Sequence, residues 1–452
     1  MSFQAEYIGE KLKLPDIDCD CGMPHRNPDM DIYIGNNILK NSGRYIKEKE
    51  LGKRALVVTD NIIDDIAGKK VVDNLKQSGF EVKICILERE EELVPDETAL
   101  GEVLLELDPE IDFLVAVGSG SINDITRYVA FNTNIPFVSI GTAPSMDGYT
   151  SVIAPLIYNK LKVNKPAQNP EVLICDLDIM KEAPFDLIIS GFGDVVGKYI
   201  AIGDWIMGRI INEEEYCPVN VEIVFQAVKK CVDNVDGIIN RTDKGIRSLI
   251  EALILAGVTI LIIGKTRAVA SNEHNMGHYI EMMKLLNDEK PARHGITVGM
   301  TTGYAIKFYE KFLKLDTDKI NKDELKAKHP SREEWEETVM AAYGEKIGPQ
   351  ILKENKEGYL DWEERERRID KTLNNFQKIR KELDFLPEYD KLKNMYKKLD
   401  LPLKAADISV NEELLQNALL YAKDYRDRYT VFKTAEELGV LQELVAEIIG
   451  SE

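Results

Sequence analysis

The stretch Phe113-Leu-Val-Ala-Val-Gly-Ser-Gly-Ser-Ile-Asn-Asp124 joins an apolar run to a short segment of glycine and serine. The run Phe113–Val117 is typical of a strand that is buried on both faces of a sheet. The small residues after it let the backbone turn tightly and present free N–H groups, at a helix start, to an anion. Ser121 and Asp124 have the spacing of a capping box, which predicts where that helix begins.

This glycine pattern differs from the ordinary dinucleotide-binding fingerprint. It does not follow GxGxxG, and it comes after a later strand rather than after the first one. A tight strand-to-helix connection without a ligand would explain the same residues. The pattern therefore indicates a nucleotide fold of another kind, or no nucleotide at all.

Similar apolar runs lie on both sides of this stretch. They are Ala55–Thr59, Val82–Ile86, Pro136–Ile140 and Val172–Asp176, and the segments Ile62–Ser78, Asp96–Leu107 and Ser121–Asn132 have helical spacing. Apolar strands that alternate with helices predict a parallel sheet covered on both faces. A hairpin is expected through Tyr158-Asn159-Lys160.

From about Phe185 onward the sequence shows only helical patterns. We therefore predict an α/β domain over residues 1–180 and an all-helical domain over 181–452. A charged helical extension is expected from about residue 321. The run Asp361-Trp-Glu-Glu-Arg-Glu-Arg-Arg368 in it is typical of a solvated helical face with charge pairs, and partner binding is the alternative.

The charge balance excludes some classes of partner. The chain has 58 basic and 78 acidic residues, a net charge of −20, which disfavours nucleic acids and anionic membranes. Met1–Leu14 lacks an apolar stretch of signal-peptide length, and Leu253–Ile263 fits a buried core helix better than a membrane span. Six scattered cysteines are typical of a reducing compartment, so we expect a cytoplasmic location.

Three of the five histidines fall in one short region, which makes their placement informative. His274 and His278 are four residues apart and point from one helical face, and His294 follows a break at Pro291. Two helices that meet at their ends can bring two imidazoles to one ion. A carboxylate is wanted as third ligand, and Asp194, in a glycine-flanked helix start, is the best candidate. Structural histidines and a helix N-cap are the alternative.

A second group with ligand chemistry is Cys19-Asp-Cys21 with His25. The spacing is not that of a common zinc motif, and no fourth ligand stands near it in the sequence. The sequence alone therefore does not favour a structural zinc there.

Five separated motifs together resemble one superfamily, that of the iron-containing alcohol dehydrogenases, glycerol dehydrogenases and 3-dehydroquinate synthases. Within it the sequence looks most like the bacterial sn-glycerol-1-phosphate dehydrogenases. The motifs are Gly118–Asp124, Thr142–Ser151, Gly191–Lys198, Glu273–His278 and His294–Gly295. The resemblance covers about the first two-thirds of the chain and implies a dehydroquinate synthase-like α/β domain followed by an all-helical domain. One departure is Ala270-Ser-Asn-Glu-His274, where Ser-Gly-x-Glu-His is expected.

The resemblance also implies roles for individual residues. Asp194, His274 and His294 would bind one divalent ion, zinc or nickel, and Asp147 and His278 would contact the substrate. For NAD or NADP, the implied residues are Gly118, Ser119, Gly120, Ser121, Ile122 and Asp124 at the pyrophosphate, Thr142, Ser145 and Ser151 at the nicotinamide, and Asp60 at the adenosine ribose.

The implied reaction interconverts dihydroxyacetone phosphate and sn-glycerol 1-phosphate, in an enzyme expected to be a homo-oligomer. The substrate phosphate needs donors, for which Lys162, Lys165, Lys198 and Arg293 are candidates. A dehydroquinate synthase-like cyclising lyase and a glycerol dehydrogenase are the enzyme alternatives. A catalytically silent scaffold that binds a partner through its charged C-terminal helices is the alternative from another class.

Overall fold

The computed structural model of the chain describes residues 6–14, 17, 19–159, 161–355 and 358–450. The chain divides into two compact units, each considered by itself. The first, the sheet unit, comprises Met1–Cys19, Pro24–Val195 and Val219–Lys265. The second, the helical unit, comprises Asp20–Met23, Val196–Pro218 and Thr266–Glu452. The strands end near the predicted boundary at residue 180, whereas the compact units divide at other points.

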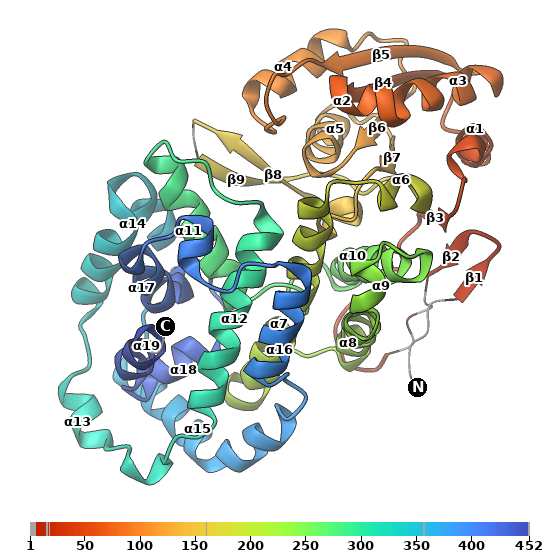
Figure 1. Cartoon of the computed structure of the whole chain (residues 1–452). Helices are drawn as coiled ribbons and strands as arrows, with labels where there is room; N and C mark the ends of the chain where they lie inside the picture. The colour runs from red at the N-terminus through yellow and green to blue at the C-terminus, as the bar shows by residue number, and fades with distance from the viewer. Residues whose placement is uncertain (1–5, 15–16, 18, 160, 356–357, 451–452) are drawn as a thin grey trace. The chain divides into compact units, whose positions relative to one another are not determined.

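The sheet unit contains an eight-stranded sheet of order β1-β2-β3-β10-β7-β6-β4-β5 (Figure 1). Its strands are β1 (Glu6–Ile8), β2 (Lys11–Lys13), β3 (Asp31–Gly35), β4 (Arg54–Asp60), β5 (Glu81–Leu87), β6 (Phe113–Gly118), β7 (Phe137–Gly141) and β10 (Val172–Asp176). Six neighbouring strands run parallel, namely β3, β10, β7, β6, β4 and β5. Strands β1 and β2 form an antiparallel hairpin beside β3. The parallel sheet is confirmed.

The five strands expected from apolar runs are all present, as β4, β5, β6, β7 and β10. The expected hairpin is also confirmed: β8 (Ile153–Tyr158) pairs antiparallel with β9 (Leu161–Pro166), although its Lys160 lies outside the described residues. Strands β1 to β3 were not predicted. They are short, and β1 and β2 carry charged residues that hide the apolar pattern.

Helices cover both faces of the parallel strands. On one face Tyr45, Val71 and Leu75 pack against strand residues, and on the other face Val103 and Ile125 do so. This gives the three layers that a parallel sheet requires. The helices of this part are α1 (Ser42–Lys47), α2 (Asn61–Ile63), the π-helical turn η2 (Asp64–Gly68), α3 (Lys69–Gln77), α4 (Glu97–Glu106), α5 (Gly120–Thr133) and α6 (Leu177–Lys181).

Three further helices belong to the sheet unit: α8 (Pro218–Asp233), α9 (Val235–Ile239) and α10 (Asp243–Ile263). Among the described helices, α10 alone is long and apolar enough to cross a membrane by length and composition, and 89% of its apolar window is buried inside the protein. Its neighbours include α6, α9 and the 3₁₀ turn η3 (Asp147–Thr150). This burial is what is expected of a core helix.

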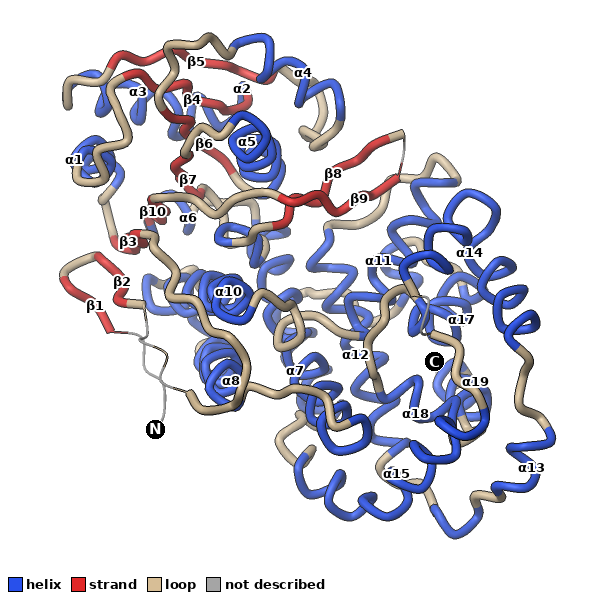
Figure 2. Tube along the Cα trace, turned by 180° about the vertical axis from the view of Figure 1, so that it is seen from behind, coloured by secondary structure: helices blue, strands red, loops and turns tan. Residues whose placement is uncertain are grey.

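Beyond β10 the described chain is helical apart from its loops (Figure 2). Besides α6 and α8 to α10, the helices there are α7 (Phe185–Asn212), α11 (Asn272–Leu286), α12 (His294–Phe312), α13 (Lys322–Ala327), α14 (Arg332–Glu354), α15 (Trp362–Glu382), α16 (Tyr389–Leu399), α17 (Glu412–Tyr421), α18 (Val431–Glu437) and α19 (Leu441–Ile449), with short 3₁₀ turns between some of them. The fold class expected from the sequence, a parallel-sheet part followed by a helical part, is confirmed.

The charged helix α15 is not only a solvated face. The expected pair at i,i+4 is present, because Arg368 contacts Glu364 at 2.7 Å. Arg365, however, is buried and donates hydrogen bonds to the carbonyl oxygens of Glu436 and Glu437 at the end of α18. Its aliphatic stem packs while its guanidinium satisfies the last carbonyls of another helix. The charged side chain of Arg365 therefore links α15 to α18 within the helical unit.

Candidate active site

The glycine–serine turn, Gly118–Asp124, leads from β6 into α5. A Cβ atom on Gly118 would lie 2.7 Å from the Cβ of Ile122, so only glycine fits against that side chain. The N-cap residue of α5 is Ser119, which makes no side-chain capping bond. The predicted capping box of Ser121 and Asp124 is wrong, because both residues lie inside the helix. The turn thus depends on close backbone packing and leaves the first N–H groups uncapped by a side chain.

The turn lies at the point in the sheet where the order of successive strands reverses. Strands β4 and β6 are neighbours, and the chain continues from β4 to β5 on one side and from β6 to β7 and β10 on the other. In open parallel sheets, ligands bind at the carboxyl ends of strands at such a point. At these ends, Asp60 is the last residue of β4, Gly118 is the last residue of β6, and Thr142 follows β7.

Buried polar atoms gather beside this edge. The backbone N–H of Thr142 donates to the carbonyl of Gly118 at 3.1 Å. The hydroxyl of Thr142 and the side-chain amide of Asn123 are buried and make no hydrogen bond to other described residues. Because buried polar groups are nearly always paired, these atoms fit a site that is completed by a polar ligand or water. Asn123 was not singled out from the sequence.

Asp124 faces an arginine that the sequence analysis missed. Arg127, one helical turn later, is fully buried and lies 3.2 Å from the Asp124 carboxylate. It also donates to the carbonyls of Ser151 and Ile153, both at 3.2 Å. Burial raises the pKa of Asp124 to about 7, against the lowering effect of Arg127. In this structure Asp124 therefore supports the arginine that fixes the loop around Ser151.

Asp60 also has a structural contact. Its Oδ1 accepts hydrogen bonds from the backbone N–H groups of Ile62 and Ile63, at 2.9 and 2.8 Å, and so caps α2. One oxygen of the carboxylate thus holds the helix start. A role toward a ribose would fall to the other oxygen.

The loop after β7 carries the residues expected at the nicotinamide and the substrate. The carbonyl of Ser145 accepts a hydrogen bond from Ser190 on α7 at 3.2 Å. The backbone N–H of Asp147 donates to the Asp194 carboxylate at 3.0 Å. Gly191 is required on α7, because a Cβ there would lie 1.8 Å from the carbonyl oxygen of Pro144. The glycine-flanked motif around Asp194 thus lets α7 pack directly on this loop.

The histidine centre consists of His274 and His278 on α11 and His294 at the start of α12. The ring centroid of His274 lies 5.5 Å from that of His294, and the centroids of His278 and His294 are 5.1 Å apart. Two imidazoles that bind one tetrahedral ion at ~2.1 Å have centroids about 5 Å apart. The helix break at Pro291 therefore brings these three side chains together as predicted from the sequence.

Two buried glutamates orient the histidines. Glu273 lies 2.7 Å from Nδ1 of His274, and Glu281 lies 2.7 Å from Nδ1 of His294. An ionised carboxylate only accepts hydrogen bonds, so it places the proton on Nδ1 and makes Nε2 the atom that can ligate. The sequence analysis gave neither glutamate this role. The spacing His278-x-x-Glu281, which puts both side chains on one helical face, could have indicated it.

The start of α11 is held by a buried network in the helical unit. Asp204 accepts hydrogen bonds from Ser271 at 2.7 Å, Tyr309 at 2.5 Å and the backbone N–H of Val431 at 2.8 Å. Burial raises the pKa of Asp204 to about 6, although these donors and Arg267 lower it. Ser271, which with Ala270 departs from the family pattern, here anchors the helix that carries His274.

The proposed third ligand, Asp194, is buried on α7. Three residues later on the same helix, a Cβ on Gly197 would lie 3.5 Å from Cε1 of His274, so α7 passes close to that ring at this glycine. Asp194 itself belongs to the sheet unit and the histidines to the helical unit. The ligand set of Asp194, His274 and His294 therefore stays a prediction.

The donor chemistry of the histidine centre fits a divalent metal ion. Imidazole nitrogens with carboxylate partners suit zinc, nickel or iron. The side chain of Asn272, the Nδ2 atom of Asn275 and the Oε2 atom of Glu273 are buried and make no hydrogen bond to other described residues. These polar atoms are consistent with a centre that holds an ion and its waters.

Comparisons with known proteins show which family the chain resembles in sequence. The family model for iron-containing alcohol dehydrogenase matches residues 33–184. The chain is 35% identical to glycerol-1-phosphate dehydrogenase [NAD(P)+] of Halalkalibacterium halodurans over 288 residues, 63% of this chain and 72% of that protein. It is 34% identical to the protein of the same name from Bacillus subtilis over 316 residues, 69% and 77% of the two chains.

The likeness extends into the C-terminal helices. The Bacillus licheniformis protein of that name is 29% identical over 431 residues, which cover 95% of this chain and 94% of that one. Among solved structures, glycerol dehydrogenase from Schizosaccharomyces pombe superposes with a TM-score of 0.60 at 14% identity, covering 96% of this chain and 94% of that one. At this identity the structural likeness concerns the fold alone.

Proposed function

Because this chain belongs to the glycerol-1-phosphate dehydrogenase family, we propose that it interconverts dihydroxyacetone phosphate and sn-glycerol 1-phosphate with NAD or NADP and a divalent metal ion. The observation that carries the proposal is the histidine centre, in which two imidazoles of neighbouring helices are each oriented by a buried glutamate. Buried carboxylates that hold the second ring nitrogen of an imidazole are a common feature of metal sites, which supports this proposal.

Asp194, His274 and His294 would hold the ion, either zinc or nickel. When bound, the ion supplies Lewis-acid stabilisation of the charge that builds on the C2 oxygen of the substrate during hydride transfer. Glu273 and Glu281 keep Nε2 of the two histidines available as ligands. His278, stacked on His294 and 5.5 Å from the ring of Tyr425, would pass the proton to or from the alcohol.

The cofactor would bind at the carboxyl edge of the sheet. The pyrophosphate would contact the turn formed by Gly118, Ser119, Gly120 and Ser121, together with Ile122 and Asp124 just inside α5. Thr142, Ser145 and Ser151 would line the nicotinamide side, and Asp60 would reach the adenosine ribose. The hydroxyl of Thr142, which is buried and makes no hydrogen bond within the described part of the chain, supports this placement.

The substrate phosphate needs cationic donors within a chain of net charge −20. Lys198 is buried on α7, and Arg293 is the N-cap residue of α12, next to His294. Lys162 is half-buried and Lys165 exposed on β9. Together with Asp147, which would bind a substrate hydroxyl, these four residues remain the candidates for the polar contacts to substrate.

An assay on the purified chain tests the proposal. Oxidation of NADH or NADPH is followed by absorbance with dihydroxyacetone phosphate, and with dihydroxyacetone as the control without phosphate. We expect turnover only with the phosphorylated ketone, loss of turnover after chelation, and recovery with zinc or nickel. Equal rates on both ketones would instead indicate a glycerol dehydrogenase. No turnover on either would favour a cyclising lyase or a scaffold.

Two further expectations from the sequence stay predictions: a homo-oligomer and a cytoplasmic location. Light scattering coupled to size exclusion would measure the first. Fractionation of the source cells would measure the second.

A further inference from the structure

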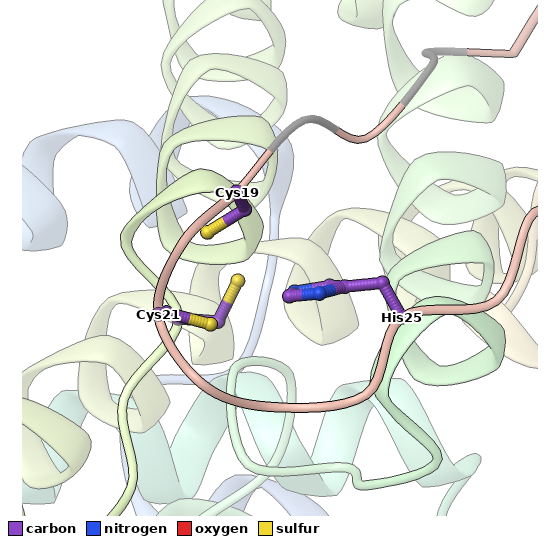
Figure 3. Close-up of side chains that lie close together, drawn as sticks. Cys19, Cys21 and His25 are labelled. Atoms are coloured by element: carbon purple, nitrogen blue, oxygen red, sulfur yellow. The ribbon is translucent and has the colours of Figure 1, made fainter.

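Outside the candidate active site, the N-terminal loop Cys19-Asp-Cys-Gly-Met-Pro-His25 places three side chains of metal-binding type together. Figure 3 shows Cys19, Cys21 and His25 pointing toward one another on the inside of the curve. Gly22 has a φ of 83°, in the left-handed region that favours glycine, and it lets the chain turn back after Cys21. The shape of the loop thus brings its three donor side chains close together.

The structure supplies the fourth donor that the local sequence lacks. The Sγ atom of Cys217 joins those of Cys19 and Cys21 and a ring nitrogen of His25, and all four atoms lie within 4.8 Å of one another. In a tetrahedral zinc site with Zn–S distances of ~2.3 Å, neighbouring sulfurs are about 3.8 Å apart. The limit of 4.8 Å between the four donor atoms is close to this spacing.

Cys217 is held in place before any metal binds. It is fully buried in the connection between α7 and α8, and the residues just before it are anchored within the helical unit. Arg267 binds the carboxylate of Glu214 at 2.7 Å, and the indole N–H of Trp205 donates to the carbonyl of Glu215 at 2.8 Å. A fixed donor lowers the ordering cost of metal binding.

The composition of the group favours a metal over a disulfide. None of the described cysteines forms a disulfide, and a pair of sulfurs would leave the imidazole and the third sulfur unexplained. Three thiolates and one imidazole are a familiar donor set of structural zinc, which prefers soft sulfur ligands in a closed tetrahedron. The remaining cysteines differ: Cys85 is buried alone on β5, and burial raises the pKa of its thiol to about 11.

We propose that Cys19, Cys21, His25 and Cys217 bind one structural Zn²⁺ ion, separate from the histidine centre. On binding, the three thiols release three protons and the imidazole ligates in its neutral form, so the complex carries a charge of −1. No coordination position remains for a substrate. The ion fixes the N-terminal loop and takes no part in the redox reaction.

Cobalt substitution tests this proposal on the full-length, reduced chain. Thiolates bound to Co²⁺ give an intense near-ultraviolet charge-transfer band, which a centre with only nitrogen and oxygen ligands does not give. We expect this band in the wild type and in His274→Ala, and we expect Cys19→Ser and Cys21→Ser to weaken it strongly. The matched control is Cys85→Ser, which should keep the band. Absence of the band in the wild type, or its equal loss in Cys85→Ser, overturns the proposal.

A second measurement needs no variant and so does not depend on how a variant folds. The zinc content of the wild type is measured first, and its thiols are then titrated with an organic mercurial while a chromogenic chelator reports released zinc. Release of one zinc per chain as three thiols react is the expected result. Zinc content that stays unchanged when the accessible thiols have reacted, or protein purified without zinc that takes up none, would contradict it.

Discussion

The glycine–serine turn and the histidine centre prepare for their ligands by opposite means. At Gly118 the backbone lies so close to Ile122 that no side chain fits, and the groups offered to an anion are main-chain N–H groups. In the histidine centre the groups offered to a metal ion are imidazoles, and carboxylates orient two of them: Glu273 beside His274 and Glu281 beside His294. At Gly118 the turn therefore has no room for an added methyl group, whereas the histidine centre depends on keeping the carboxylates beside its imidazoles.

This difference determines which substitutions are informative. In the turn, a methyl group added at one glycine or the other shows whether that glycine is needed for packing of the protein or for approach of the ligand. In the histidine centre, replacing a glutamate by glutamine removes the charge that orients an imidazole but keeps the imidazole itself as a ligand. The largest effect is expected where a ligand atom itself is removed.

His274→Ala and His294→Ala should each abolish metal retention and lower kcat/KM about 1,000-fold, because Lewis-acid stabilisation contributes several kcal/mol to such a reaction. The rate is measured with dihydroxyacetone phosphate, and bound metal by elemental analysis. The matched control is His329→Ala, since His329 lies outside the centre and contacts Arg365 and the ring of Trp362. Variants that keep metal and full turnover would refute the assignment of these ligands.

Glu281→Gln should weaken metal affinity roughly 10- to 100-fold while leaving the fold intact. The amide keeps the shape of the side chain but no longer stabilises the proton on Nδ1 of His294 as a carboxylate does. Affinity is measured by competition with a chelator. Glu289→Gln, an exposed change just after α11, is the control. If both variants bind metal like the wild type, Glu281 does not orient the ligand.

Gly118→Ala and Gly120→Ala should change stability in opposite directions. The methyl of the first would overlap Ile122, which costs about 1–3 kcal/mol of unfolding free energy. The methyl of the second meets only Met146, at an ordinary 3.6 Å, and alanine favours the helix by up to ~1 kcal/mol. If a pyrophosphate approaches this turn, Gly120→Ala raises KM for the cofactor about tenfold without loss of stability. An unchanged KM would place the cofactor elsewhere.

The same contrast explains what the sequence could predict. The strand, the turn and the helix around Gly118 are contiguous, so their pattern shows the fold and its switch from strand to helix directly. The cluster of His274, His278 and His294 was also predictable, because helical spacing and the break at Pro291 act over a short range.

Partners that are distant in the sequence could not be predicted in this way. Nothing in the sequence around Asp124 indicates that Arg127 binds the carbonyls of Ser151 and Ile153. The Cys19 loop likewise lacked a fourth donor until the fold brought Cys217 to it. Such pairings depend on tertiary packing, which local spacing does not encode.

The smallest effect is expected at Asp60, where a capping role and a ligand role share one carboxylate. Asp60→Asn should keep α2 capped, because asparagine is as good an N-cap residue as aspartate, and the unfolding midpoint should not change. Removing the negative charge should shift the ratio of kcat/KM for NADP to that for NAD upward about fivefold, equivalent to ~1 kcal/mol. Asp60→Ala should shift the ratio equally but also lose about 1 kcal/mol of stability with the cap. An unchanged ratio in both variants would mean that capping is the only role of Asp60, and that another group selects the cofactor.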